Sequence, residues 1–98
     1  MDRGELREII HAGLGRDTDE STLSVMLELQ RELDRRMDNL GYLLVNGQIT
    51  QDEYRKSLHL AMMWMQQQGC NVMGQHDFTA VFGDLKSLAN DTSQSFQK

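Results

Sequence analysis

The sequence predicts an all-α protein, a small helical bundle built on a long antiparallel helical hairpin. Three observations predict this class. The 98 residues contain no proline, the residue that most strongly interrupts helices. Apolar residues recur at intervals of three and four, as on one face of a helix. Residues 40–54 combine a helix stop with a helix start. We expect about four helices, at residues 3–14, 19–46, 51–69 and 77–89. They should form one domain over residues 1–90, followed by a flexible polar tail over residues 91–98.

The first expected helix, over residues 3–14, carries Leu6, Ile9 and Ile10 at helical spacing. Gly15 follows it and predicts its end, because glycine readily adopts the left-handed conformation that closes a helix. The polar and acidic residues that come next predict an exposed connection.

The second expected helix, over residues 19–46, is the longest. Gln30 stands where its seven-residue apolar repeat calls for an apolar side chain. Two interpretations remain open for Gln30: it fixes the register or oligomeric state of the bundle, or the helix reaches solvent there. The repeat consists of Leu23, Met26, Leu33, Met37, Leu40 and Leu44.

The corner of the hairpin has its own sequence signals. Asn46 and Gly47 form a typical helix ending, since both tolerate the left-handed conformation. Thr50 can accept a hydrogen bond as the N-cap of the next helix. Glu53, three residues on, can reach back to complete a capping box. A turn this short predicts that the two helices lie antiparallel and adjacent.

Ile49 and Tyr54 flank this cap at the two positions of a hydrophobic staple. The whole stretch resembles the helical hairpin of short C-terminal domains of the SHOCT type, and the resemblance covers about fifteen residues. It implies a small oligomerisation hairpin and assigns no functional residue. The residues that carry it are Leu40, Leu43, Gly47, Ile49, Thr50, Glu53 and Tyr54.

The return helix, over residues 51–69, has two apolar faces. One face should pack on the preceding helix, and it consists of Tyr54, Leu58, Ala61, Met62 and Met65. Leu60, Met63 and Trp64 lie on nearly the opposite side. A hairpin alone would leave them in water. We therefore expect Leu60, Met63, Trp64 and Gln67 to bind a partner.

Residues 70–76 are expected to form a short connection after Gly69. Asp77 is then placed to cap the last helix. That helix has a single apolar stripe, which consists of Phe78, Val81, Phe82, Leu85 and Leu88.

Composition narrows the classes of function. Fifteen acidic against ten basic residues give a net charge of −5, which argues against a nucleic-acid-binding protein. No apolar run is long enough for a membrane span, and the charged N-terminal residues are unlike a signal peptide. Cys70 is the one cysteine, so no internal disulfide can form. A cytoplasmic location is the simplest expectation.

The sequence favours no catalytic or metal chemistry. Cys70 and His76 lie six residues apart, which is not a known zinc-ligand spacing, and we expect no metal or other cofactor. No nucleophile stands beside an evident base and orienting acid, so we do not expect an enzyme. Seven methionines suit an adaptable apolar surface.

We therefore expect a small acidic interaction module with an adaptor, chaperone-like or inhibitory regulatory role. Its partner would be another protein or a second copy of the chain, most simply as a homodimer. The alternative is a metal- or thiol-responsive sensor that uses Cys70, His76 and nearby methionines.

Overall fold

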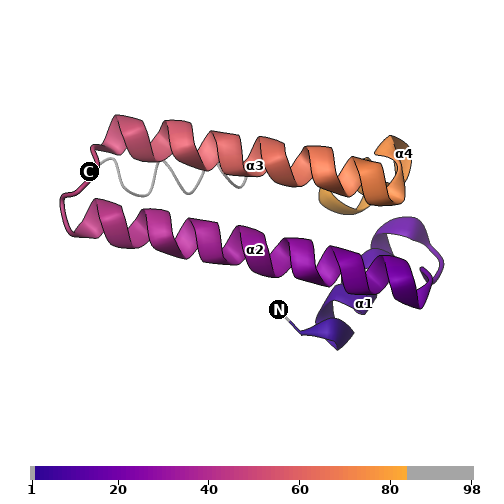
Figure 1. Ribbon diagram of the computed structural model, residues 1–98. Coiled ribbons are helices and arrows are strands. Elements are labelled where there is room, and N and C mark those ends of the chain that lie inside the picture. The colour runs from indigo at the N-terminus through magenta and orange to yellow at the C-terminus, as the bar shows by residue number, and fades with distance from the viewer. Residues whose placement is uncertain (1, 84–98) are drawn as a thin grey trace.

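The computed structural model describes residues 2–83, and all regular structure in that range is helical. The helices are α1 (Arg3–Leu14), α2 (Glu20–Val45), α3 (Gln51–Met73) and α4 (Gln75–Phe82). The two long helices, α2 and α3, run antiparallel beside each other (Figure 1). The predicted all-α class and the central hairpin are thus confirmed. None of the described helices has the length and apolar character needed to cross a membrane.

Helix α1 has the predicted bounds, because a cap closes each of its ends. At its start, the side chain of Asp2 accepts a hydrogen bond from the backbone N–H of Glu5 at 2.8 Å. This bond favours the charged carboxylate and lowers the pKa of Asp2. At its end, Gly15 has a φ of 71° and its N–H donates to the carbonyl of His11.

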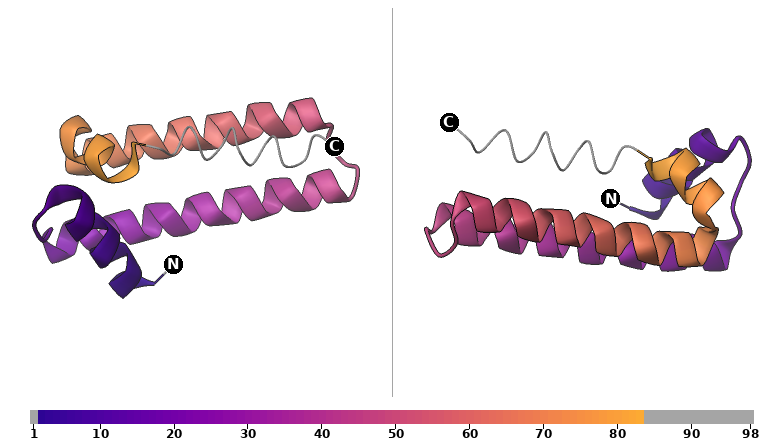
Figure 2. Two further views of the ribbon diagram at one scale, coloured as in Figure 1. Left: turned by 180° about the vertical axis from the view of Figure 1, so that it is seen from behind. Right: turned by 90° about the horizontal axis from the view of Figure 1, so that it is seen from above.

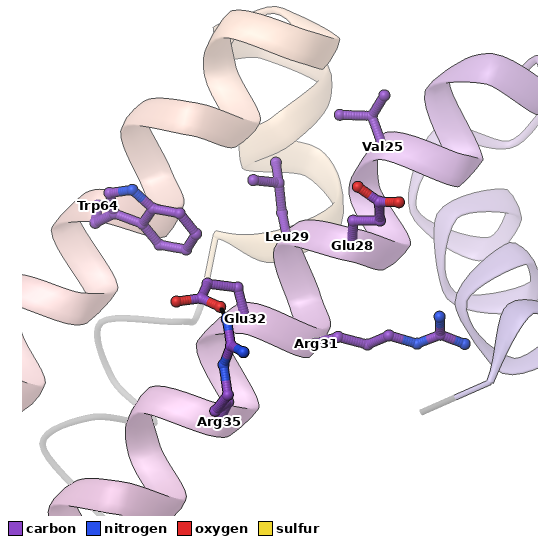
Figure 3. Close-up of a pocket in the computed structure, with 7 residues that line it drawn as sticks. All are labelled: Val25, Glu28, Leu29, Arg31, Glu32, Arg35 and Trp64. Carbon is purple, nitrogen blue, oxygen red and sulfur yellow. Dashed lines mark hydrogen bonds and ion pairs between the residues drawn. The ribbon is translucent and has the colours of Figure 1, made fainter.

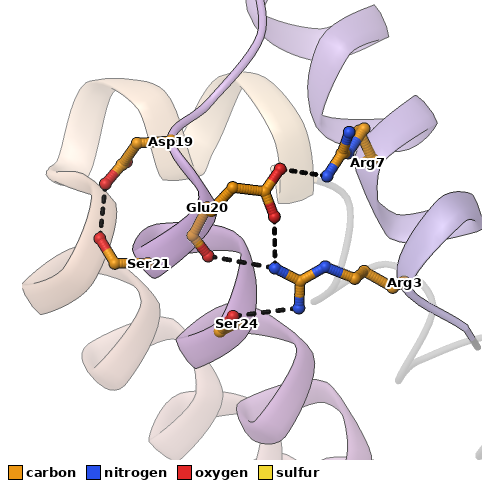
Figure 4. A network of polar contacts seen from close by, with 6 residues as sticks. All are labelled: Arg3, Arg7, Asp19, Glu20, Ser21 and Ser24. Atoms are coloured by element: carbon orange, nitrogen blue, oxygen red, sulfur yellow. Dashed lines mark hydrogen bonds and ion pairs between the residues drawn. The ribbon is translucent and has the colours of Figure 1, made fainter.

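A small polar network joins α1 to the start of α2 (Figure 4). Arg3 and Arg7 both form ion pairs with Glu20, and the guanidinium of Arg3 also donates to the hydroxyl of Ser24 at 3.0 Å. The hydrogen bond from Arg3 and the two positive charges lower the pKa of Glu20. Since these side chains are largely exposed, solvent screens the pairs, and the network orients α1 more than it stabilises the fold.

The corner between α2 and α3 forms by the predicted turn chemistry. Gly47 has a φ of 71°, and its N–H donates to the carbonyl of Leu44 at 3.1 Å. The N–H of Gln48 donates to the carbonyl of Leu43 at 2.9 Å, which completes a Schellman ending. The capping box of Thr50 and Glu53 is present in both directions, at 3.1 and 3.0 Å. The corner is therefore fixed by hydrogen bonds at both helix ends.

Helix α3 is longer than predicted, and the expected end at Gly69 is wrong. The helix continues through residues 70–73 and stops at Gly74, whose φ is 89°. Gly69 is instead a packing position. A Cβ at Gly69 would lie 2.1 Å from Cε1 of Phe78, so only glycine lets that ring approach the helix. The expected connection over residues 70–76 therefore shrinks to a turn at Gly74.

Helix α4 begins two residues earlier than predicted, and Asp77 is not its cap. Gly74 occupies the cap position without a side-chain hydrogen bond, and Asp77 lies inside the first turn of the helix. There its carboxylate pairs with Arg16 at 2.9 Å. The predicted continuation to residue 89, with Leu85 and Leu88, and the tail over residues 91–98 lie outside the described residues.

The two short helices lie on the same side of the layer that α2 and α3 form, at its open end (Figure 2). They contact each other there, and Gly13 makes the approach possible. A Cβ at Gly13 would lie 2.9 Å from the Cα of Val81, closer than two such atoms can come. Helices α1 and α4 thus cover one side of the hairpin near its open end.

One apolar core joins the four helices. Its most deeply buried members come from α1, α2 and α3, and Phe78 adds the contribution of α4. Ile49 and Tyr54, the predicted staple residues, both pack into this core, and Tyr54 is only 3% exposed. Burial raises the pKa of the Tyr54 hydroxyl. Among the described residues, the largest fully buried side chains are Leu6, Ile10, Leu23, Met26, Leu33, Leu58 and Met65.

Candidate functional site

The candidate partner-binding residues lie on the side of α3 that faces away from the core. Leu60 is 64% exposed and Met63 is 50% exposed, although the core side of the same helix is almost fully buried. Gln67, one turn further on, is also exposed. These three residues line one open hollow together with Trp64 and Cys70. The structure thus places the predicted residues together on one surface.

Trp64 differs from the expectation, because it is half-buried rather than fully directed outward. It packs against the edge of the core, and the guanidinium carbon of Arg36 lies 4.0 Å from the centre of its ring. This is the geometry of a cation–π contact. Trp64 therefore fills the seam between α3 and α2 and joins the exposed residues of both helices.

A second open hollow lies on the α2 side of Trp64 (Figure 3). In this view Trp64 reaches from α3 toward Leu29 and Glu32 of α2. Val25, which is 45% exposed, lies one turn before Leu29. Because Trp64 lines both hollows, the two form one continuous surface. We call this surface the outer face, and its apolar residues are Val25, Leu29, Leu60, Met63 and Trp64.

Charged side chains of α2 border the outer face. Glu32 forms ion pairs with Arg35 and with Arg36, the latter at 3.0 Å. Glu28 and Arg31 also line the α2 hollow, but neither forms an ion pair with another residue within the described range 2–83. The apolar centre is therefore edged by both signs of charge, as is usual at protein–protein interfaces.

The carboxyl groups with lowered pKa values lie elsewhere, at helix starts. Besides Asp2 and Glu20, they include Asp19 and Glu53. Hydrogen bonds from Ser21 and Thr22 lower the pKa of Asp19, and the backbone N–H of Thr50 lowers that of Glu53. The shifts of Asp2 and Glu53 accompany helix capping, whereas those of Glu20 and Asp19 come from hydrogen bonds with neighbouring side chains. None of these four carboxyl groups lines the outer face.

The residues of the metal- or thiol-sensor alternative do not converge. Cys70 is half-buried on α3 and lines the hollow with Leu60, whereas exposed His76 lines a separate hollow at the start of α4. Within the described part of the chain, no group of three His, Cys, Asp or Glu side chains could hold a metal ion. This alternative stays a prediction without a geometric site.

Gln30 is half-buried on α2, and its amide donates to the carboxylate of Asp34 at 3.3 Å. This bond gives one amide N–H of Gln30 a partner within its own helix. The interpretation of Gln30 as a register-fixing residue stays a prediction.

Sequence reasoning missed the α2 half of the outer face. Val25, Leu29, Glu32 and Arg36 follow the helical spacing of four, three and four residues, which places them on one stripe. That spacing was a usable signal. The signal is hidden because Leu29 is apolar and lies close to Met26 and Leu33 of the core repeat, so the sequence alone does not separate it from the core stripe.

The described residues define a class of protein: a small all-α hairpin with two short helices on one side and an apolar outer face bordered by charges. Comparisons with protein-family models, with curated proteins and with solved structures each find no match to this chain. The function is therefore inferred from the geometry of the chain itself.

Proposed function

We propose that this chain is a non-enzymatic protein–protein interaction module that binds its partner through the outer face. The partner is another protein or a second copy of the chain, and the role is that of an adaptor, chaperone-like or inhibitory regulator in the cytoplasm. The observation that carries the proposal is the exposure of Leu60 and Met63 beside a half-buried tryptophan. Clustered exposure of large apolar side chains is typical of a binding surface.

The chemistry of the outer face supports this function. Tryptophan and arginine are the residue types most enriched among side chains that dominate binding energy, and here Arg36 lies on the ring of Trp64. Met63 adds a flexible and polarizable side chain that adapts to a partner surface. The sequence of the corner resembles SHOCT-type hairpins, and this resemblance implies a small oligomerisation hairpin.

The proposal is tested by placing a charge on the outer face without disturbing the core. Leu60→Glu and Met63→Glu each introduce a carboxylate at a position that is at least half exposed, so the monomer should stay folded. We expect each variant to lose association, measured by analytical ultracentrifugation and by pull-down with the tagged chain.

Ile9→Glu is the matched control, because Ile9 is 38% exposed on α1 and lines neither hollow of the outer face. It should associate like the wild type. If Leu60→Glu and Met63→Glu bind every partner as well as Ile9→Glu does, the outer face is not the binding surface.

A further inference from the structure

We infer that a second copy of this chain occupies the outer face, with the two copies antiparallel and related by a two-fold axis. The axis crosses α2 between Arg31 and Glu32 and crosses α3 at Trp64. This inference rests on the proposed function, and it adds the identity of the partner and the arrangement of the two chains.

The border charges give the first argument. Glu28 and Arg35 are seven residues apart on α2, so they lie along the same edge of the helix, and both line the α2 hollow. In an antiparallel pair of α2 helices, Glu28 of each copy can face Arg35 of the other. In a parallel pair the same edge would bring Glu28 against Glu28 and Arg35 against Arg35. Because like charges in contact are unfavourable, the charges along this edge of α2 favour the antiparallel arrangement over the parallel one.

The two charges are also free to make this exchange. Glu28 forms no ion pair with any other residue in the range 2–83. Arg35 pairs with Glu32, but its side chain is 78% exposed, and Glu32 keeps Arg36 if Arg35 turns to a second copy. The edge can therefore form two new ion pairs per dimer and leaves Glu32 partnered.

The position of Trp64 gives a second, independent argument. The midpoint between Glu28 and Arg35 lies between Arg31 and Glu32. Trp64 meets α2 between Leu29 and Arg36, and the centre of that span lies one residue further along the helix, a rise of about 1.5 Å. A two-fold axis placed by the charges alone therefore passes beside Trp64. The largest apolar side chain of the outer face then meets its own copy at the centre of the interface, where dominant binding residues usually lie.

The size of the face is sufficient. The molecule measures 43 × 20 × 20 Å, so one long side offers roughly the ~800 Å² that each partner contributes to a standard interface. The short helices α1 and α4 lie together on one side of the hairpin layer (Figure 2). Two copies can thus stack hairpin on hairpin into a four-helix core without displacing the short helices.

The experiment exchanges the charges one at a time and then mixes the products. Glu28→Arg places arginine opposite Arg35 of the other copy at both symmetric contacts, and Arg35→Glu places two carboxylates there. We expect the wild type to have twice the monomer mass of 11.3 kDa in sedimentation equilibrium. Each variant should dimerise about tenfold more weakly than the wild type.

An equimolar mixture of the two variants is the decisive measurement. In the mixed dimer, the arginine introduced by Glu28→Arg in one chain meets the carboxylate introduced by Arg35→Glu in the other. The second contact joins the unchanged Arg35 of the first chain and the unchanged Glu28 of the second. We expect native mass spectrometry to show mainly the mixed dimer, with an affinity within about twofold of the wild type. Weakened folding of a monomer cannot produce this recovery. Glu8→Arg on α1 makes the same charge change away from the outer face and should dimerise normally.

Three results would overturn the inference. A wild type that remains monomeric at millimolar concentration excludes a second copy, and binding of another protein that Leu60→Glu abolishes would then keep the proposed function. A dimer in which mixing restores nothing, or in which the single variants are unaffected, excludes the antiparallel arrangement. A dimer that also tolerates Leu60→Glu and Met63→Glu uses another surface, and both proposals fail.

Discussion

Replacing Gly69 by alanine should destabilise the protein, although the same change normally stabilises a helix. Inside a helix, alanine is favoured over glycine by about 1 kcal/mol. At Gly69 the new Cβ would lie 2.1 Å from Cε1 and 2.3 Å from Cδ1 of Phe78. Carbon atoms need ~3.5 Å, so the ring must move by more than ~1 Å. Phe78 is 2% exposed, and its neighbours must move with it. Overpacking of a core on this scale costs up to ~3 kcal/mol, which leaves a net loss of about 2 kcal/mol.

The measurement is urea denaturation followed by circular dichroism, with Gly41→Ala as the matched control. Gly41 lies inside α2, and a Cβ there would meet no described atom within 4 Å. Gly41→Ala should therefore raise the free energy of unfolding by about 1 kcal/mol. The double variant Gly69→Ala with Phe78→Leu should lose less than the sum of the two single changes, because a smaller side chain relieves the clash. If Gly69→Ala stabilises the protein as much as Gly41→Ala does, the packing account of Gly69 is wrong.

Three further predictions concern stability. Thr50→Ala removes the N-cap of α3 and should lower the free energy of unfolding by about 1 kcal/mol. The thermal midpoint should then be ~4–8 °C lower than that of the wild type. An unchanged midpoint would contradict the role of the cap. Leu58→Ala truncates a side chain that is 0% exposed and should lower the free energy of unfolding, measured by urea denaturation, by about 3 kcal/mol. A loss of less than ~1 kcal/mol would show that this position is not tightly packed. The fold lowers the pKa of Glu53, chiefly through the backbone N–H of Thr50, and that of Glu20, chiefly through Arg3. A carboxyl with a lowered folded pKa stabilises the fold above its ordinary value of 4.5 and loses that contribution as the pH falls through the folded pKa. Stability should therefore decrease below about pH 4.5 in urea titrations, and Glu53→Gln, which has no carboxyl group to titrate, should decrease less steeply.

The parts of the fold that depend on near neighbours were predictable from the sequence. The bounds of α1 and α2 and both hydrogen-bonded ends of the corner follow from residues that interact within one or two helical turns. The end of α3 was not predictable in the same way. Gly69 after three glutamines has the signature of a helix stop. Its lack of a side chain instead makes room for the ring of Phe78, nine residues later, and only the packing of α4 against α3 shows this.

The candidate site was half predictable for a related reason. The angular positions of Leu60 and Met63 on α3 already place them away from the core, and the structure leaves both exposed. The position of Trp64 depends on how far α3 is rotated against α2. Periodicity within one helix says nothing about that rotation. The contact of Arg36 with Trp64, and the continuous surface with Val25, are therefore visible only once the two helices are packed.

The corner between α2 and α3 has a consequence for the order in which the chain folds. Its hydrogen bonds join residues within the range 42–54, so little chain entropy is lost when they form. Docking of the short helices, by contrast, brings together residues as distant as Arg16 and Asp77, which are 61 positions apart. We expect the hairpin to close rapidly from its corner and the open end to assemble last. The same end should then open first, so amide protons of α1 and α4 should exchange with solvent sooner than those in the middle of α2 and α3.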